Sequence, residues 1–367
     1  MVSKKLLLII SAHEGSDSWQ KTIKLCNNEN IVCKQISILK DNDYRTNSAV
    51  KKIYNRFYIY VFFTLFLFSK IPLILKAENY LIITSPFYLP PLLSVFLPPK
   101  KIIILHNDLY PEGFKHFKFS FIFKFLYKVF NYFPEKRIKK CKHHIFLSSE
   151  HLKLRKYKNS IVIHPPAFKP SEISIKYPKN SSKISIGYCG TLGFNHCGLE
   201  FLELLKHSRF NNYFSFQFNI SGAQQVNFNR KIKTFNKHNK NYEVLTGGSL
   251  SQKNYDKFMR NLDFGLILLK SNSSDTVFPS KLSAHLAFNH PVILISDQKN
   301  LIHEFIIKNK IGISINLNDR NLNELSNLYN DDMVTSMKKN VAICFENEFS
   351  STQFSSKLQK IVNQTNF

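Results

Sequence analysis

The sequence of 367 residues is poor in acidic residues and in cysteine, and it has no long apolar run. Its six cysteines include no CxxC pair and follow no regular spacing, which argues against both a zinc site and a disulfide framework. Its longest apolar run, Phe57–Ser69, has thirteen residues and ends at Lys70 and Pro72. A helix needs about 20 residues to cross a bilayer, so we expect a buried or interfacial helix there.

The first ten residues, MVSKKLLLII, combine two lysines with a short apolar run. No small-residue cleavage site follows this run, so we expect a first β-strand here and not a signal peptide. Together with the cysteine pattern, this predicts a cytoplasmic protein.

The shortage of acids leaves a net charge of +26, from 51 Lys and Arg against 25 Asp and Glu. Residues 1–165 hold 27 of the basic and 10 of the acidic residues, so most of the surplus lies in the first half. An excess of this size favours an acidic partner, although AT-rich coding is another source of lysine. No zinc spacing, recognition helix or RNP-like aromatic pattern accompanies the lysines, so we do not expect nucleic acid to be that partner.

The segment Lys115–Lys140 mixes aromatic and aliphatic residues at steps of three and four with interleaved lysines. This pattern is typical of an amphipathic helix lying on anionic lipid headgroups. A core helix with a solvated basic edge is the alternative.

Strand-like and helix-like runs alternate along the chain, which predicts parallel sheets with helices on both faces. The expected strands in the first half are Lys5–Ile10, Ile31–Ile38, Tyr80–Thr84, Lys101–Leu105 and His144–Leu147. Those in the second half are Ile184–Tyr188, Phe214–Ile220, Tyr242–Leu245, Phe264–Leu268, Val292–Ile295 and Ile311–Ile315. The proline-containing stretch Ile161–Pro170 separates the halves. We therefore expect an α/β protein of two Rossmann-like domains with a cleft between them.

Ligands of open parallel sheets bind beyond the carboxyl ends of the strands, which directs attention to the loops that follow them. In the first half these loops carry a glycine turn, Gly15-Ser16, and the acid-rich stretch His106–Glu112. In the second half, Gly190, Thr191 and Gly193 follow one strand, and Lys270 and Lys281 flank another loop. The two lysines and the following helix N-terminus could clamp a diphosphate. An ordinary turn and a solvated lysine pair are the alternatives.

Three phrases in order resemble motifs of one enzyme family. They are His106–Glu112 (HNDLYPE), Gly187–Gly193 (GYCGTLG), and Leu269-Lys270 followed by FPSKL (278–282), LA (286–287) and PVI (291–293). They are similar to the signatures of retaining nucleotide-sugar glycosyltransferases of the two-domain GT-B fold, family 4 type. The likeness is strongest to enzymes of bacterial surface-polysaccharide assembly, such as that of lipopolysaccharide O-antigen or capsule.

The resemblance implies transfer of a sugar from a nucleotide diphosphate, uridine-linked, to a lipid-linked or oligosaccharide acceptor at the inner face of the cytoplasmic membrane, without metal or cofactor. It implies an acceptor-binding domain over 1–165, a donor-binding domain over 166–345 and a helix over 346–367 that returns to the first domain. The implied catalytic residues are His106, Asp108 and Glu112, and the implied acceptor-binding residues are Gly15 and Ser16. The implied donor-binding residues are Gly190, Thr191, Gly193, Lys270, Pro279, Ser280 and Lys281.

The sequence departs from the family pattern at two positions. Ala284 stands where the family has a glutamate that binds the ribose, and Asn289, which tolerates the left-handed conformation, stands where it has glycine. Either Ser283, His285 or Glu304 replaces the missing carboxylate, or donor binding is weak, or the chain is an inactive GT-B protein that binds polysaccharide intermediates or partner enzymes. A nucleotide-sugar epimerase is the nearest enzymatic alternative.

Overall fold

The computed structural model divides into two compact units, Met1–Phe168 with Ser351–Phe367 (unit 1) and Lys169–Ser350 (unit 2). We expected domain boundaries after residues 165 and 345; the units divide a few residues later at each point. The structure describes residues 4–40, 54, 58–84, 86–107, 109, 121, 124–125, 128–129, 134–155, 157–170, 183–193, 196–206, 213–222, 224–239, 243–270, 278–297, 300–319 and 322–364.

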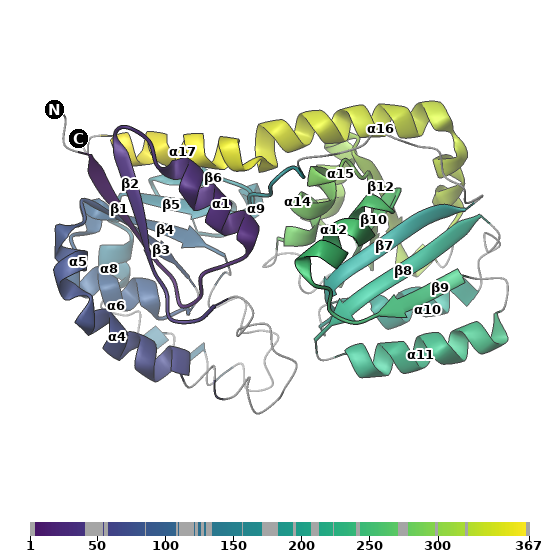
Figure 1. Cartoon of the computed structure of the whole chain (residues 1–367), viewed down its shortest axis with the longest axis horizontal. Helices are drawn as coiled ribbons and strands as arrows, with labels where there is room; N and C mark the ends of the chain where they lie inside the picture. Colours follow the sequence, from purple (N-terminus) through teal and green to yellow (C-terminus); the bar gives the residue numbers. More distant parts are fainter. Residues whose placement is uncertain are drawn as a thin grey trace. The chain divides into compact units, whose positions relative to one another are not determined.

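Unit 1 contains a parallel sheet of order β2-β1-β3-β4-β5-β6, six strands in its described part (Figure 1). Its strands are β1 (Lys5–Ile10), β2 (Ile31–Ile36), β3 (Asn79–Ile83), β4 (Ile102–His106), β5 (His143–Phe146) and β6 (Ser160–Val162). Its helices are α1 (Asp17–Cys26), η1 (Tyr58–Phe62), α4 (Phe63–Ser69), α5 (Ile71–Lys76), α6 (Leu89–Phe96), η2 (Pro99–Lys101), α8 (Glu135–Ile138), α9 (Ser149–Arg155) and α17 (Ser351–Asn363).

The central strands of this sheet are buried and largely apolar, as expected for parallel strands covered on both faces. All five residues of β3 and of β4 are buried. Strand β6 was not predicted, because Ile161 and the following residues were expected to form a linker. Prolines 165 and 166 follow this short edge strand and leave its pairing with β5 intact.

The C-terminal helix α17 runs alongside α1 in unit 1 (Figure 1). The Thr22 hydroxyl donates to the Ser351 hydroxyl at 2.7 Å, and the rings of Trp19 and Phe354 meet edge to face. At the far end, the buried Lys142 amine donates to the Asn79 side chain at 2.9 Å and to the carbonyl of Val362 at 3.0 Å. These contacts fix the last turns of the chain to the sheet.

Unit 2 contains a second parallel sheet of order β12-β11-β10-β7-β8-β9, again six strands among its described residues. Its strands are β7 (Ile184–Thr191), β8 (Phe214–Ser221), β9 (Glu243–Gly247), β10 (Phe264–Leu269), β11 (Val292–Ser296) and β12 (Gly312–Asn316). Its helices are α10 (Gly198–Lys206), α11 (Gln225–His238), α12 (Gln252–Arg260), α14 (Ser280–Ala287), α15 (Leu301–Asn309), η4 (Leu317–Asp319), η5 (Asn323–Tyr329), α16 (Asp331–Cys344) and η6 (Phe345–Phe349).

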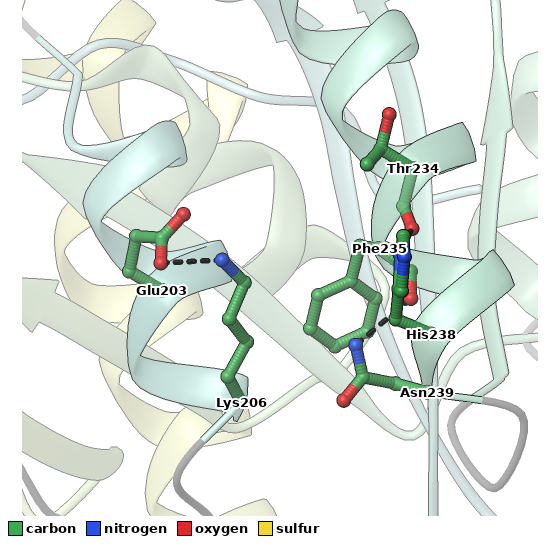
Figure 2. Close-up of polar contacts among 6 residues, drawn as sticks. All are labelled: Glu203, Lys206, Thr234, Phe235, His238 and Asn239. Carbon is green, nitrogen blue, oxygen red and sulfur yellow. Dashed lines mark hydrogen bonds and ion pairs between the residues drawn. The ribbon is translucent and has the colours of Figure 1, made fainter.

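Strand β7 extends three residues beyond the expected end at Tyr188, because β8 pairs with it as far as Thr191. The phrase expected as a loop therefore begins inside the sheet. Side chains make polar contacts in the last turns of α10 and α11 (Figure 2). His238 and Asn239 donate to the carbonyls of Thr234 and Phe235 at the end of α11, and Lys206 pairs with Glu203 in α10.

The apolar run Phe57–Ser69 forms η1 and α4, and α5 begins at Ile71 with Pro72 in its first turn. Most of the segment Lys115–Lys140 lies outside the described residues, so its expected amphipathic helix stays a prediction. No helix in the described ranges combines the length and the apolar character needed to cross a membrane.

The buried amine of Lys142 yields a test of how α17 is held. Replacing Lys142 by Met should lower the free energy of unfolding by about 1–3 kcal/mol, because the oxygens of Asn79 and Val362 lose their donor. Urea unfolding measures this change. Lys139→Met, which removes an exposed lysine, is the matched control, and equal unfolding midpoints for the two variants would contradict the role of Lys142.

Candidate functional site

His106 is the last residue of β4, and its buried side chain contacts a second histidine. Nε2 of His106 lies 3.1 Å from Nδ1 of His144, and Nε2 of His144 lies 3.0 Å from the carbonyl oxygen of Ile138. Phe146 stacks on the His106 ring with centroids 4.5 Å apart and planes within 6°. We call His106 and His144 the histidine pair.

Burial determines the charge of this pair. It lowers the pKa of His144 to about 4, and it holds the pKa of His106 well below its usual range, with smaller contributions from His144 and Arg155. Both rings are therefore neutral at pH 7. His144 was not predicted as a site residue, although both strands were expected. The available signal was a histidine on the strand next to the one that ends in His106.

Of the other residues implied for the first domain, the structure describes Gly15 and Ser16. Asp108 and Glu112 lie outside the described residues. Gly15 has φ +82°, where a side chain would meet the Trp19 ring, and the Ser16 hydroxyl accepts the Trp19 amide hydrogen as the N-cap of α1. Gly15 and Ser16 thus shape the start of α1, and their acceptor-binding role stays a prediction.

In unit 2, the side chain of Lys281 crosses the backbone of Gly190. A Cβ at residue 190 would lie 3.0 Å from Lys281 Cε, and the φ of +130° there also disfavours a side chain. Lys281 Nζ lies 5.0 Å from the ring centroid of Tyr188 and 3.4 Å from the carbonyl oxygen of Thr191. The Tyr188 hydroxyl donates to the same carbonyl at 2.7 Å. Glycine at 190 therefore makes room for the amine over an aromatic ring.

His196 completes this group of residues, which we call the Lys281 cluster: Tyr188, Gly190, Thr191, His196 and Lys281. The backbone amide of Gly193 donates to Nδ1 of His196 at 3.0 Å. Burial, together with the charge of Lys281, lowers the pKa of His196 to about 4. His196 was not predicted as a site residue, because only the folded turn brings its ring back onto Gly193.

Lys281 is a cation without a carboxylate partner among the residues that the structure describes. It is half-buried, and burial lowers the pKa of its amine to about 8. It is also the second residue of α14, whose N-cap is Pro279 and whose first residue, Ser280, is exposed. An anion placed here would meet a positive charge and the partial positive charge of a helix N-terminus.

Lys270, the other half of the expected clamp, has a partner within the protein. Its amine forms an ion pair of 2.6 Å with Glu200 in the first turn of α10. The structure thus gives the two lysines different neighbours: an acid for Lys270, and an aromatic ring and a carbonyl for Lys281.

Two of the residues considered as replacements for the missing glutamate, Ser283 and His285, are engaged in contacts within unit 2. The Ser283 hydroxyl donates to the carbonyl of Ser280 at 2.8 Å, and His285 is buried against Gly265 and His290. Glu304 is exposed in the first turn of α15. Asn289 has φ +59°, so its predicted left-handed conformation is confirmed.

Groups of three or more His, Cys, Asp or Glu side chains that could hold a metal ion are absent from the described parts of the chain. The metal-independence implied by the sequence stays a prediction.

Comparison with known proteins identifies the fold. No family model matches the sequence, and no curated protein matches it. Among solved structures, a glycosyltransferase from Rickettsia africae has a TM-score of 0.66 at 14% identity, over 99% of this chain and 100% of that one. Anabaena HepE in complex with UDP has a TM-score of 0.65 at 8% identity, over 97% and 98%. The lipopolysaccharide outer core galactosyltransferase WaaB has 0.59 at 12%, over 98% and 99%. The chain has the two-domain α/β fold of these GT-B glycosyltransferases.

The surroundings of Lys281 yield a titration test. Its amine should lose its proton near pH 8, because burial disfavours the ammonium form, whereas a solvated lysine titrates near 10.4. Above pH 8 the cluster therefore loses its positive charge. Reductive ¹³C-methylation followed by NMR titration measures the midpoint, and the Lys281→Arg variant assigns the resonance by its loss. A midpoint near 10.4 would contradict the described burial.

Proposed function

We propose that this chain, which has the fold of GT-B glycosyltransferases, transfers a sugar from a uridine diphosphate sugar to an acceptor hydroxyl, with retention of the anomeric configuration. The observation that carries the proposal is the Lys281 cluster. It offers a half-buried ammonium, without a carboxylate partner in the described chain, whose side chain lies against the backbone of Gly190.

The chemistry of the donor explains why such a cation is needed. When the bond between the anomeric carbon and the diphosphate oxygen breaks, negative charge grows on the leaving diphosphate. Lys281 and the N-terminus of α14 would stabilise that charge more in the transition state than in the ground state. Gly190, Thr191, Gly193, Lys270, Pro279 and Ser280 belong to this donor site in our proposal. Lys270 would contribute after exchanging Glu200 for the ligand.

The solved structures with this fold support the choice of donor. HepE was crystallised with UDP, and WaaB is a galactosyltransferase of the lipopolysaccharide outer core. Transfer from a uridine-linked donor, to a lipid-linked or oligosaccharide acceptor in surface-polysaccharide assembly, is the activity that we infer for this chain by analogy.

In unit 1, His106 would contact the reacting sugar, and Asp108 or Glu112 would orient the acceptor. A neutral imidazole at the end of a central strand accepts a hydrogen bond from a hydroxyl group. Gly15 and Ser16 would approach the acceptor through their backbone. We assign donor binding to unit 2 and acceptor binding to unit 1.

The surface of unit 1 supports an acceptor at a membrane. Helices α4 and α5 bury Phe63, Leu67 and Ile74, yet they also expose apolar side chains on their outer side. Leu65, Phe68 and Leu75 are 59%, 57% and 72% exposed. Lys70 extends its amine over the Phe66 ring, 4.9 Å from its centroid. Exposed apolar side chains beside lysines suit the headgroup region of an anionic bilayer, so we place the protein peripherally at the inner face of the cytoplasmic membrane.

Ala284 favours a second candidate, an inactive GT-B protein that binds polysaccharide intermediates or partner enzymes. The Ser283 hydroxyl already bonds to its own helix, and the His285 ring packs in the core. Neither side chain offers the lost carboxylate, so weak or absent donor binding would follow if no other group holds the ribose.

Binding of UDP discriminates these candidates. We expect a specific nucleotide sugar to raise the melting temperature in a panel of uridine and guanosine diphosphate sugars. Lys281→Ala should weaken UDP binding roughly tenfold to hundredfold in titration calorimetry, because a hydrogen bond to a charged group contributes about 1.5–3 kcal/mol. Lys253→Ala, an exposed lysine of the same unit, is the control. Absence of nucleotide binding by the wild-type protein would support the inactive candidate instead.

Vesicle flotation tests the membrane placement. Replacing Leu65, Phe68 and Leu75 by Ser should lower binding to vesicles rich in phosphatidylglycerol at least about tenfold, because their burial in the interface is lost. Charge removal at Lys124, Lys128 and Lys136 should act in the same direction. The matched control is Val226→Ser with Ile343→Ser, which removes exposed apolar side chains of unit 2. Equal binding by all variants would refute the placement.

A further inference from the structure

The parallel register between β4 and β5 places His144 next to His106 on the same face of the sheet. His106 pairs with Phe146, and His144 precedes Phe146 by two residues, so all three side chains lie on one face of the sheet. The two imidazole centroids are 5.4 Å apart with planes 21° from parallel. Tyr157 stacks on His144 with its centroid at 4.0 Å. Aromatic contacts therefore hold both rings in fixed orientations.

The hydrogen bonds within this stack determine where the ring protons lie. The Ile138 carbonyl only accepts, so Nε2 of His144 carries a hydrogen and donates to it. A neutral imidazole has one N–H, so Nδ1 of His144 is an acceptor. The bond from His106 to that atom then requires Nε2 of His106 to donate. The remaining nitrogen of His106, Nδ1, is left as an acceptor.

We propose that His144 is a positioning residue: it holds His106 in the Nε2–H form, so that Nδ1 accepts a hydrogen bond from a carbohydrate hydroxyl group. This rests on the role proposed above for His106 in sugar transfer. The backbone carbonyl of Ile138 sets the direction of the whole relay, because a carbonyl cannot donate. This chain of hydrogen bonds requires both rings to be neutral, and burial keeps them neutral by lowering the pKa of each.

Removal of His144 changes the preferred form of His106 for a physical reason. Without an acceptor at this place, the buried Nε2–H of His106 loses its hydrogen bond, and the form protonated at Nδ1 gains population. That form offers a donor where the sugar hydroxyl needs an acceptor. His144→Phe keeps an aromatic ring against Tyr157 but accepts nothing, whereas His144→Gln supplies an oxygen toward His106 and an amide hydrogen toward Ile138.

Long-range ¹H–¹⁵N NMR of the full-length protein labelled at histidine reads the ring protonation directly. The His106 signals are assigned by their loss in His106→Asn. We expect the Nε2–H form in the wild type and in His144→Gln, and population of the Nδ1–H form in His144→Phe. An Nδ1–H form of His106 in the wild type would overturn the proposal, and this measurement needs no variant of His144 to fold.

Steady-state kinetics with the donor identified by thermal shift provide a second test of the role of His144. In His144→Phe, kcat should fall roughly threefold to tenfold with an unchanged KM for the donor, and His144→Gln should recover most of it. A His144→Phe protein with the wild-type ring form and the wild-type kcat would overturn the role of His144. If the wild type transfers no sugar at all, the proposed function fails, and the NMR arm alone decides the positioning role.

Discussion

Parallel strand pairing is the constraint on which both candidate sites depend. Because the strands of each sheet run in one direction, the residues that end or follow them collect at one edge, although they are far apart in sequence. His106 ends β4, Thr191 ends β7 and Lys270 follows β10. The register between neighbouring strands then decides which side chains meet. It places His144 on the face of His106, and it carries β7 along β8 to the point where Lys281 crosses Gly190.

Burial lowers the pKa of the titratable side chains in both groups of residues. The histidine pair is neutral because desolvation disfavours imidazolium, and aromatic rings and one carbonyl complete its contacts. Lys281 lies over an aromatic ring and against a carbonyl, which hold its charge less firmly than a carboxylate would. An incoming diphosphate could therefore take over this cation without displacing an acid. Lys270 is paired with Glu200, so a diphosphate that binds Lys270 would have to displace this acid.

The sequence was a good guide to the elements and a partial guide to the sites. Ten of the expected strands match within a few residues because buried parallel strands are long apolar runs, and β7 differs only in its longer end. Strand β6 was missed because three residues before prolines carry little pattern. Loop motifs directed attention to His106 and Lys281. The neighbouring expected strand did contain His144, but the register that brings its ring to His106 is not encoded in any local pattern. The position of His196 and the pairing of Lys270 with Glu200 likewise depend on distances across turns and elements.

Turnover of a labelled donor tests the central claim most directly. The wild-type protein, incubated with a radiolabelled uridine diphosphate sugar and a bacterial lipid extract as the source of acceptor, is predicted to move label into the lipid fraction and to release one UDP for each sugar transferred. The product should keep the anomeric configuration of the donor. Tight binding of the nucleotide sugar with no transfer to any acceptor, or conversion of the donor into its epimer, would contradict the account.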